Sequence, residues 1–341
     1  GGPGGTGGPG GTPPPTIPAN GCFPAPGRCG LPDPNYHNVG ATSACSSLPA
    51  SGSKTVTVAG STVANVNVTG TIVIGAPNVT INNVCVTNGN GTLGTYGIRI
   101  NKGANGAVIT HTTVSGANAT DQSIDQAISN PDEASVTASY DYFYNCGECV
   151  WGGPYTLTYS YVITNGQPYQ NGYSGGSGLG QVQHLEDLYC SDATENLDHD
   201  VLLDPADQNS SVFCDTQYGG GGPCDNHITI TNSLMAGGAF VIYTCGNASG
   251  VGSSTMNISN NRIARCTTPP FRYNSAVGGT TCQGSPGTSV GSGADGHGYW
   301  PGGGYFGPVA ANSTYCPPTA GQTWAGNVWD DNGASLSCRS S

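Results

Sequence analysis

The chain has 341 residues, enough for one large domain or two ordinary ones, and only 8% of them are charged. Its formal net charge is −12, and its eight Lys and Arg residues are widely scattered, so no nucleic acid is expected as a partner. No run of apolar residues is long enough to cross a bilayer, so the sequence predicts no insertion into a membrane.

Cysteine usage points to an oxidising compartment. The chain has 14 cysteines, an even number, and only two lysines, together with eight Asn-x-Ser/Thr sequons. These features predict a secreted, extracellular protein with up to seven disulfides. The sequons leave glycosylation open, because Asn beside Thr also suits the turns of a β-solenoid. Cys22 and Cys29 could close a small loop. Cys146–Cys149 and Cys214–Cys224 have spacings that resemble zinc sites, although disulfides are the favoured interpretation.

The N-terminal segment 1–20 contains mainly Gly, Pro and Thr and reads as a flexible or extended linker. We expect this linker to join the domain to a segment that is missing from the N-terminus. The domain itself is predicted to span residues 21–341.

One strand-like sequence pattern recurs from residue 78 onward. NVTINNVCV (78–86), GAVITHTTV (106–114) and ASVTASYDY (134–142) follow one another at a constant interval. Less regular copies are YTLTYSYVI (155–163), VQHLEDLYC (182–190), HITITNSLM (227–235) and MNISNNRIA (256–264). Shorter apolar pieces lie between them, namely YGIRI (96–100), QAIS (126–129), ECVW (148–151), DVLL (200–203), FVIYT (240–244) and FRYN (271–274).

A period of this length is typical of a solenoid or a propeller. A propeller blade needs four antiparallel strands, and units with two or three short strands are too small for that. We therefore predict an all-β, right-handed parallel β-helix with capped ends and many disulfides. The tail from about residue 293 is expected to cover the C-terminal end.

Three stretches carry a family resemblance. TIVIGAPNVTINNV (71–84), YGIRI followed by GAVITHTTV, and WAGNVWDDNG (324–333) resemble the secreted bacterial right-handed β-helix proteins of the pectin lyase-like superfamily. The resemblance implies the fold and an extracellular polysaccharide partner. It does not imply one activity, because such folds host many functions. The polygalacturonase pattern is not matched, since DGHG (295–298) follows NRIAR and no Arg-x-Lys exists.

Candidate catalytic groups come from two places. The shorter strands begin with Tyr96, Gln126, Glu148 and Asp200, and two coil rises predict that Glu148 and Asp200 lie about 10 Å apart. That value is close to the roughly 6.5–9.5 Å between the carboxylates of an inverting glycosidase.

The segment 191–207 is the most acidic part of the chain, with seven titratable groups. It reads as a solvated acidic loop, as a carboxylate glycosidase site or as a Ca²⁺ site. The predicted catalytic residues are Asp198, Asp200, Glu148 and the auxiliary His199. Ca²⁺ would be held by Asp198, Asp200 and Asp204. In an alternating strand Asp198 and Asp200 would face one side and His199 the other.

Substrate binding has four candidate residues. A lyase-like mechanism needs a basic residue, and Arg99 and Arg272 are candidates, unless each is a surface Arg paired with an acid. Trp151 and Tyr155 could form a platform for sugar rings, or could stack inside the helix.

Two functions remain open. The first is an extracellular polysaccharide-directed protein, a glycoside hydrolase more than a polysaccharide lyase. The alternative is a non-catalytic structural, adhesive or filament-forming protein that assembles end to end.

Overall fold

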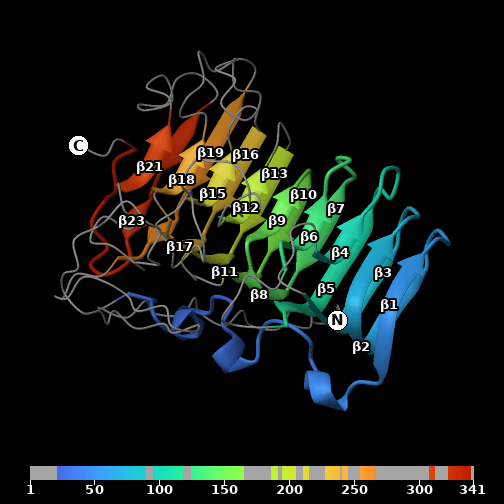
Figure 1. Cartoon of the computed structure of the whole chain (residues 1–341). Coiled ribbons are helices and arrows are strands. Elements are labelled where there is room, and N and C mark those ends of the chain that lie inside the picture. The colour runs from blue at the N-terminus through green and yellow to red at the C-terminus, as the bar shows by residue number, and fades with distance from the viewer. Residues whose placement is uncertain are drawn as a thin grey trace, which may run out of the picture.

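The computed structural model describes residues 21–89, 95–117, 124–164, 186–190, 194–204, 210–214, 227–238, 240–244, 254–265, 307–311 and 322–338. These residues form 23 strands and three short 3-10 turns, η1 (Pro26–Cys29), η2 (Pro34–Tyr36) and η3 (Cys45–Ser47). One continuous hydrogen-bonded sheet joins all of the strands, and successive coils pair in parallel (Figure 1). The predicted parallel β-helix is confirmed. No helix in the described part of the chain is long and apolar enough to cross a membrane.

The sheet winds through three faces. The first face contains part of β2 (Thr62–Ile74), then β3 (Thr80–Asn88), β5 (Ala107–Gly116), β7 (Val136–Ser139), β10 (Tyr155–Thr158), β13 (Thr194–Asp198), β16 (His227–Thr231), β19 (Thr255–Ser259) and β22 (Thr323–Ala325). The second face contains β8 (Tyr142–Cys146), β11 (Tyr161–Thr164), β14 (Val201–Asp204), β17 (Leu234–Gly237), β20 (Arg262–Ile263) and β23 (Val328–Trp329).

The third face begins with the end of β2, beside which lies the edge strand β1 (Ala50–Val56). It continues with β4 (Tyr96–Ile100), β6 (Gln126–Asn130), β9 (Glu148–Gly152), β12 (Glu186–Cys190), β15 (Ser210–Cys214), β18 (Phe240–Thr244) and β21 (Gly307–Ala311).

The repeat fixes the pairing of the early coils. Thr80 lies opposite Val108, which confirms the predicted interval between the first two copies of the repeat. The third copy is shifted by one residue, because Val108 lies opposite Thr137. Two later assignments were wrong: residues 186–190 belong to the third face and residues 201–204 to the second. The cause is the insertion between β11 and β12, which interrupts the spacing just where the copies become irregular.

Strict alternation builds the core. In the first face every second side chain points inward, and one column of in-register residues runs through the molecule almost fully buried, namely Ile81, Ile109, Ala138, Leu157, Leu197, Ile230 and Ile258. Each fully buried aliphatic side chain of this kind contributes about 1.5–3 kcal/mol of transfer free energy.

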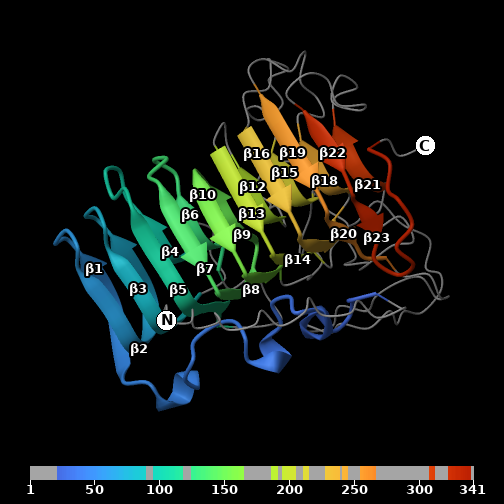
Figure 2. The ribbon, with the colours of Figure 1, turned by 180° about the vertical axis from the view of Figure 1, so that it is seen from behind.

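Residues 21–49 form an N-terminal arm along the outer side of the second face (Figure 2). Leu31 and Val39 of this arm pack in one apolar cluster with Tyr161, Val201 and Leu234. At the last coil the backbone N–H of Cys22 donates to Asp330 Oδ2 at 2.9 Å. At the other end of the arm a disulfide joins Cys45 to Cys85 of β3. The arm therefore spans the coils from the last to the first.

Four disulfides are present in the described residues: Cys22–Cys29, Cys45–Cys85, Cys146–Cys149 and Cys190–Cys214. Cys22 and Cys29 close the predicted small loop. Cys146 and Cys149 form a disulfide, and Cys214 pairs with Cys190 instead of Cys224.

The described parts of the C-terminal tail extend the helix. β21, β22 and β23 pair with β18, β19 and β20, so they form a further coil where a cap alone was expected. The chain then turns back, and Leu336 donates its N–H to Asn327 O at 2.8 Å. Leu336 and Cys338 belong to the main core cluster. The predicted linker, residues 1–20, lies outside the described residues.

Candidate functional site

Glu148 and Glu186 lie side by side where the chain enters the third face, and Asp187 follows Glu186 in its strand. Glu148 begins β9, and Glu186 and Asp187 begin the neighbouring strand β12. Glu186 pairs directly with Glu148 in the parallel register. Glu148 is partly exposed, whereas Glu186 and Asp187 are fully buried. We call these three residues the corner site.

One row of the sheet leads to the corner site. Tyr96 lies opposite Gln126 on the next coil, and Gln126 Nε2 donates to Glu148 Oε2 at 2.9 Å. Glu186 follows Glu148 in this row. Neighbouring strands lie about 4.8 Å apart, so two carboxyl groups in register come close to one another. The predicted row was right as far as Glu148, but its next member is Glu186 and not Asp200.

Asp187 has the environment of a protonated acid. Its Oδ2 accepts a hydrogen bond from Ser211 Oγ at 2.5 Å. Its Oδ1 is buried without a hydrogen-bond partner among the described residues. Burial raises the pKa of Asp187 well above its usual value and the charge of Glu186 adds to this, although hydrogen bonds from Ser211 and the backbone of Thr164 act in the opposite direction. Burial therefore favours the protonated form of this carboxyl group.

Asp204 lies close to this corner at the end of β14. Its buried carboxylate accepts a hydrogen bond from Thr164 Oγ1 at 2.9 Å, and Thr164 also contacts Asp187 through its backbone. Within the described ranges, no group of three or more His, Cys, Asp or Glu side chains is arranged to hold a metal ion. The predicted Ca²⁺ set of Asp198, Asp200 and Asp204 is spread over a turn and a strand end.

Asp198, His199 and Asp200 lie at the sharp turn between the first and second faces. His199 adopts a left-handed backbone with φ of 59°, and this breaks the strand alternation. As a result Asp198 is partly exposed while Asp200 is fully buried, so they do not share a side. That prediction was wrong because it treated the turn as a continuous strand.

Asp198 is held on the outer side of the turn. Its Oδ1 accepts hydrogen bonds from Thr231 Oγ1 and Asn232 Nδ2, each at 2.7 Å, and its Oδ2 lies 2.9 Å from His199 Nδ1. Partial burial alone would raise the pKa of Asp198, but the hydrogen bonds from Thr231, Asn232 and His199 lower it below the usual value. The side chains of Asp198 and His199 therefore already interact with each other.

Asp200 belongs to a turn ladder of buried polar residues, one per coil. In this ladder each side chain after the first accepts a hydrogen bond from the backbone N–H of the ladder residue on the coil before. Ser160 N–H donates to Asp200 Oδ1 at 2.8 Å, and Asp200 N–H donates to Ser233 Oγ at 3.0 Å. The ladder consists of Thr112, Asp141, Ser160, Asp200, Ser233, Asn261 and Asn327. These contacts give Asp200 a structural role, and its catalytic role stays a prediction.

The two aromatic candidates differ in location. Tyr155 is only 1% exposed and packs in the main core, where its hydroxyl donates to Trp151 O at 2.9 Å. It cannot form part of an open platform. Trp151 lies on the outer side of the third face and stacks on Tyr189 with ring centroids 6.3 Å apart. The stack continues to Phe213 and Tyr243 with centroid distances of 5.5 and 4.9 Å.

The basic candidates lie away from the carboxyl groups or outside the described residues. Arg99 lies over the ring of Tyr96 at 4.9 Å, and its Nη1 donates to Ser129 Oγ at 3.4 Å. Arg272 lies outside the described residues.

Glu186 and Asp187 were missed from the sequence. A signal existed, because Glu148-Cys-Val-Trp151 and Glu186-Asp-Leu-Tyr189 share the pattern Glu-x-apolar-aromatic. This pattern was hidden because residues 182–190 were aligned with the wrong strand of the repeat. Comparison of the chain with protein-family models, curated proteins and solved structures gives no match.

Proposed function

We propose that this chain is an extracellular polysaccharide-directed protein that acts as a glycoside hydrolase at the corner site. The parallel β-helix, the four disulfides and the resemblance of residues 71–84 to the pectin lyase-like superfamily support the substrate class. The observation that carries the proposal is the buried carboxyl of Asp187, whose pKa is raised beside two further carboxyl groups.

Glycoside hydrolysis uses two carboxyl groups with different tasks. Asp187 is the group that donates a proton to the leaving-group oxygen of the glycosidic bond, because burial favours its protonated form. Glu148, which is partly exposed and positioned by Gln126 Nε2 at 2.9 Å, is the partner carboxyl that meets the sugar or the attacking water. Glu186 pairs with Glu148 and precedes Asp187 in the strand, and its charge adds to the effect of burial in raising the pKa of Asp187.

The test is a panel of neutral and acidic plant and microbial polysaccharides incubated with the full chain. We expect new reducing ends from the wild type and their loss in Asp187→Asn and Glu148→Gln. Asp331→Asn is the matched control, because Asp331 forms a surface ion pair with Arg265 at 2.9 Å in the last coil. An unsaturated, ultraviolet-absorbing product would identify a lyase instead.

A second candidate is the non-catalytic structural or adhesive protein. The turn ladder favours it, because Asp200, one of the predicted catalytic acids, is fully used in holding successive coils together. A folded, disulfide-bonded sample that releases no product from any polysaccharide would support this function and contradict hydrolysis.

A further inference from the structure

The outer side of the first face is a regular two-dimensional array of small polar side chains. Two of the outward positions on each strand form rows that are in register from coil to coil, from β2 to β22. A third outward position is occupied by Thr194, His227 and Thr255 on β13, β16 and β19. The first row is Thr62, Thr80, Val108, Thr137, Thr156, Asn196, Thr229, Asn257 and Thr323. The second row is Ala64, Asn82, Thr110, Ser139, Thr158, Asp198, Thr231, Ser259 and Ala325. Every member of both rows is exposed or partly exposed.

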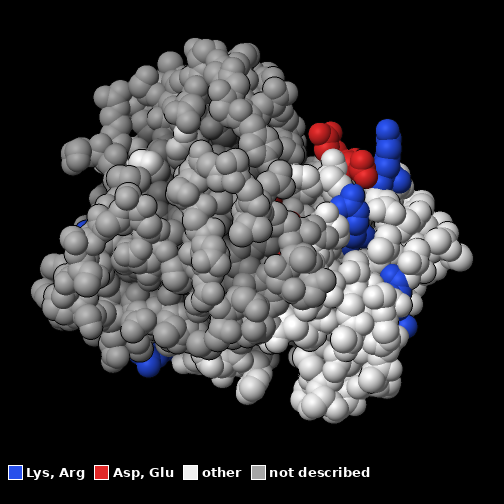
Figure 3. All heavy atoms as spheres, viewed as in Figure 1, with Lys and Arg blue, Asp and Glu red and all other residues white. Residues whose placement is uncertain are grey.

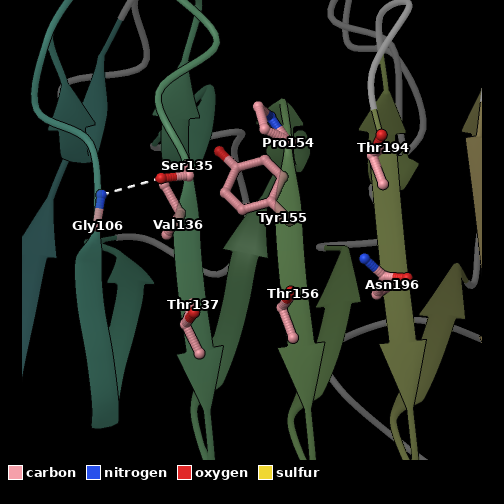
Figure 4. Close-up of a pocket in the computed structure, with 9 residues that line it drawn as sticks. All are labelled: Gly106, Ser135, Val136, Thr137, Pro154, Tyr155, Thr156, Thr194 and Asn196. Atoms are coloured by element: carbon pink, nitrogen blue, oxygen red, sulfur yellow. Dashed lines mark hydrogen bonds between the residues drawn. The ribbon is translucent and has the colours of Figure 1, made fainter.

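The geometry of the array follows from the sheet. Neighbouring strands lie about 4.8 Å apart, and two residues along a strand span about 6.6 Å. Figure 4 shows Thr137, Thr156 and Asn196 projecting from three adjacent strands toward the same side. A shallow pocket of about 150 Å³ lies at the start of these strands beside Pro154, and Thr137, Thr156 and Asn196 of the first row help to line it. Thr side chains are stiff at χ1, which keeps the hydroxyl and methyl groups at fixed positions.

The hydroxyl groups of the first row are unused. Those of Thr62, Thr80, Thr137, Thr156, Thr229 and Thr323 make no hydrogen bond to any described residue. Each can donate one hydrogen bond and accept others. Only one side chain in the two rows carries a charge, that of Asp198, and its carboxylate is already bound by Thr231, Asn232 and His199. Figure 3 shows charged side chains on the described part of the face it presents, with red and blue groups adjacent at its upper right.

This surface lacks the aromatic ring faces that usually bind sugar rings. Carbohydrate recognition exploits aromatic ring faces, and neither row contains an aromatic residue. A column of rings lies at the edge of the face, where Tyr140 stacks on His111 at 5.1 Å and on Tyr159 at 5.3 Å, and Tyr159 on His199 at 4.7 Å. Their faces are occupied by one another, so they present only their edges.

We propose that this array binds ice, the ordered lattice of water. Its regular spacing in two directions allows many weak contacts to form at once with a periodic solid. A single flexible polymer chain cannot make the same contacts simultaneously. The free hydroxyls replace lattice waters, the Thr methyl groups fill the gaps between them, and the lack of charge avoids a tightly held hydration shell. This activity lies beyond polysaccharide hydrolysis and uses a different face from the corner site.

The test measures the gap between melting and freezing temperatures of a solution of the full chain, and the shape of single ice crystals grown in it. We expect the wild type to open such a gap and to facet the crystals. Thr156→Tyr and Thr229→Tyr should each lose most of this effect, because a large ring protrudes from the flat array while remaining a good strand former. Thr55→Tyr is the matched control, since Thr55 is an exposed strand threonine on β1, opposite Val73 at the edge of the third face.

Folding of each variant is checked by its thermal unfolding midpoint. No gap for the wild type, or an equal loss in Thr55→Tyr, would overturn the proposal. So would binding to insoluble cellulose or chitin that both array variants lose while ice growth is unaffected, because the array would then serve a polysaccharide.

Discussion

The carboxylate of Asp200 accepts a hydrogen bond at 2.8 Å from the backbone N–H of Ser160 on the preceding coil. Both residues are fully buried, and the same link recurs from coil to coil along the turn ladder. Where the ladder reaches the last coils, Asn261 and Asn327 provide the same acceptor without a charge. Asp200 therefore occupies a position that a neutral side chain can also fill.

The first prediction concerns the pH dependence of stability. Burial raises the pKa of Asp200 well above its unfolded value of about 3.9, although hydrogen bonds from Ser160 and Asp198 oppose this. The folded protein then binds more protons than the unfolded chain, so this contribution is complete below about pH 4 and is lost as the pH rises. Asp200→Asn should remove that loss and gain stability relative to the wild type between pH 4 and pH 8, measured by urea unfolding.

Asp198→Asn is the control with the opposite sign. The pKa of Asp198 is lowered, so its contribution is present above its unfolded pKa and is lost as the pH falls. This variant should lose more stability at pH 8 than at pH 4. An Asp200→Asn variant whose stability changes equally at both pH values would show that Asp200 titrates normally.

The second prediction concerns the N-terminal arm. Asp330 is 2% exposed, accepts hydrogen bonds from the backbone of Cys22 and Phe23, and pairs with Arg262. Asp330→Ala leaves these donors buried, so the free energy of unfolding should fall by about 3 kcal/mol. Asp331→Ala, which breaks the more exposed pair with Arg265, should cost less than about 1 kcal/mol. Equal effects in guanidinium unfolding would contradict this role of Asp330.

The third prediction concerns the left-handed turn. Tyr159 has a φ of 51°, a conformation that β-branched residues rarely adopt, whereas Asn tolerates it. Tyr159→Asn and Tyr159→Val both lose the stacking on Tyr140 and His199. Only the Val variant adds backbone strain, so it should be less stable than the Asn variant by about 1–2 kcal/mol. Equal thermal midpoints of the two variants would argue against the turn geometry.

The fourth prediction compares two disulfides. The Cys45–Cys85 bridge has a sequence separation of 40, and the Cys146–Cys149 bridge a separation of only 3. Loop-closure entropy then predicts that replacing both cysteines by Ser costs about 4 kcal/mol for the long loop and about 2 kcal/mol for the short one. The measurement is the urea midpoint of each double variant, and the reverse order would contradict an entropic role of the Cys45–Cys85 link.

The fold could be predicted from the sequence because the apolar residues that face inward can be recognised within each single repeat. Ile81 and Ile109 occupy the same position in successive copies of the repeat and stack in the core, as their similar context suggests. The turn ladder was not predicted, because its position is occupied by Asp, Ser, Thr or Asn in different coils. No single residue type therefore recurs there as a signal. The N-terminal arm was also not predicted, since Cys22 and Asp330 lie at opposite ends of the domain's sequence and no local pattern encodes their contact.

The candidate site was predicted in part for the same reason. Glu148 and its neighbour Gln126 were placed in the correct row, because the early coils are regular. Glu186 and Asp187 follow an insertion that shifts the strand assignment, and Asp200 was put in their place. Whether a carboxyl is buried or solvated depends on neighbouring coils, so the raised pKa of Asp187 could not be inferred from its own segment.

Hydrolysis at the corner site requires Asp187, which follows Glu186 in the strand, to be a protonated acid at neutral pH. The most direct measurement is the infrared difference spectrum between the wild type and Asp187→Asn at pH 7, in the region of the carboxylic acid C=O stretch. We expect an acid band in the wild type that the variant lacks, and we expect this band to disappear only at more alkaline pH. A difference spectrum with carboxylate bands alone at pH 7 would contradict the claim.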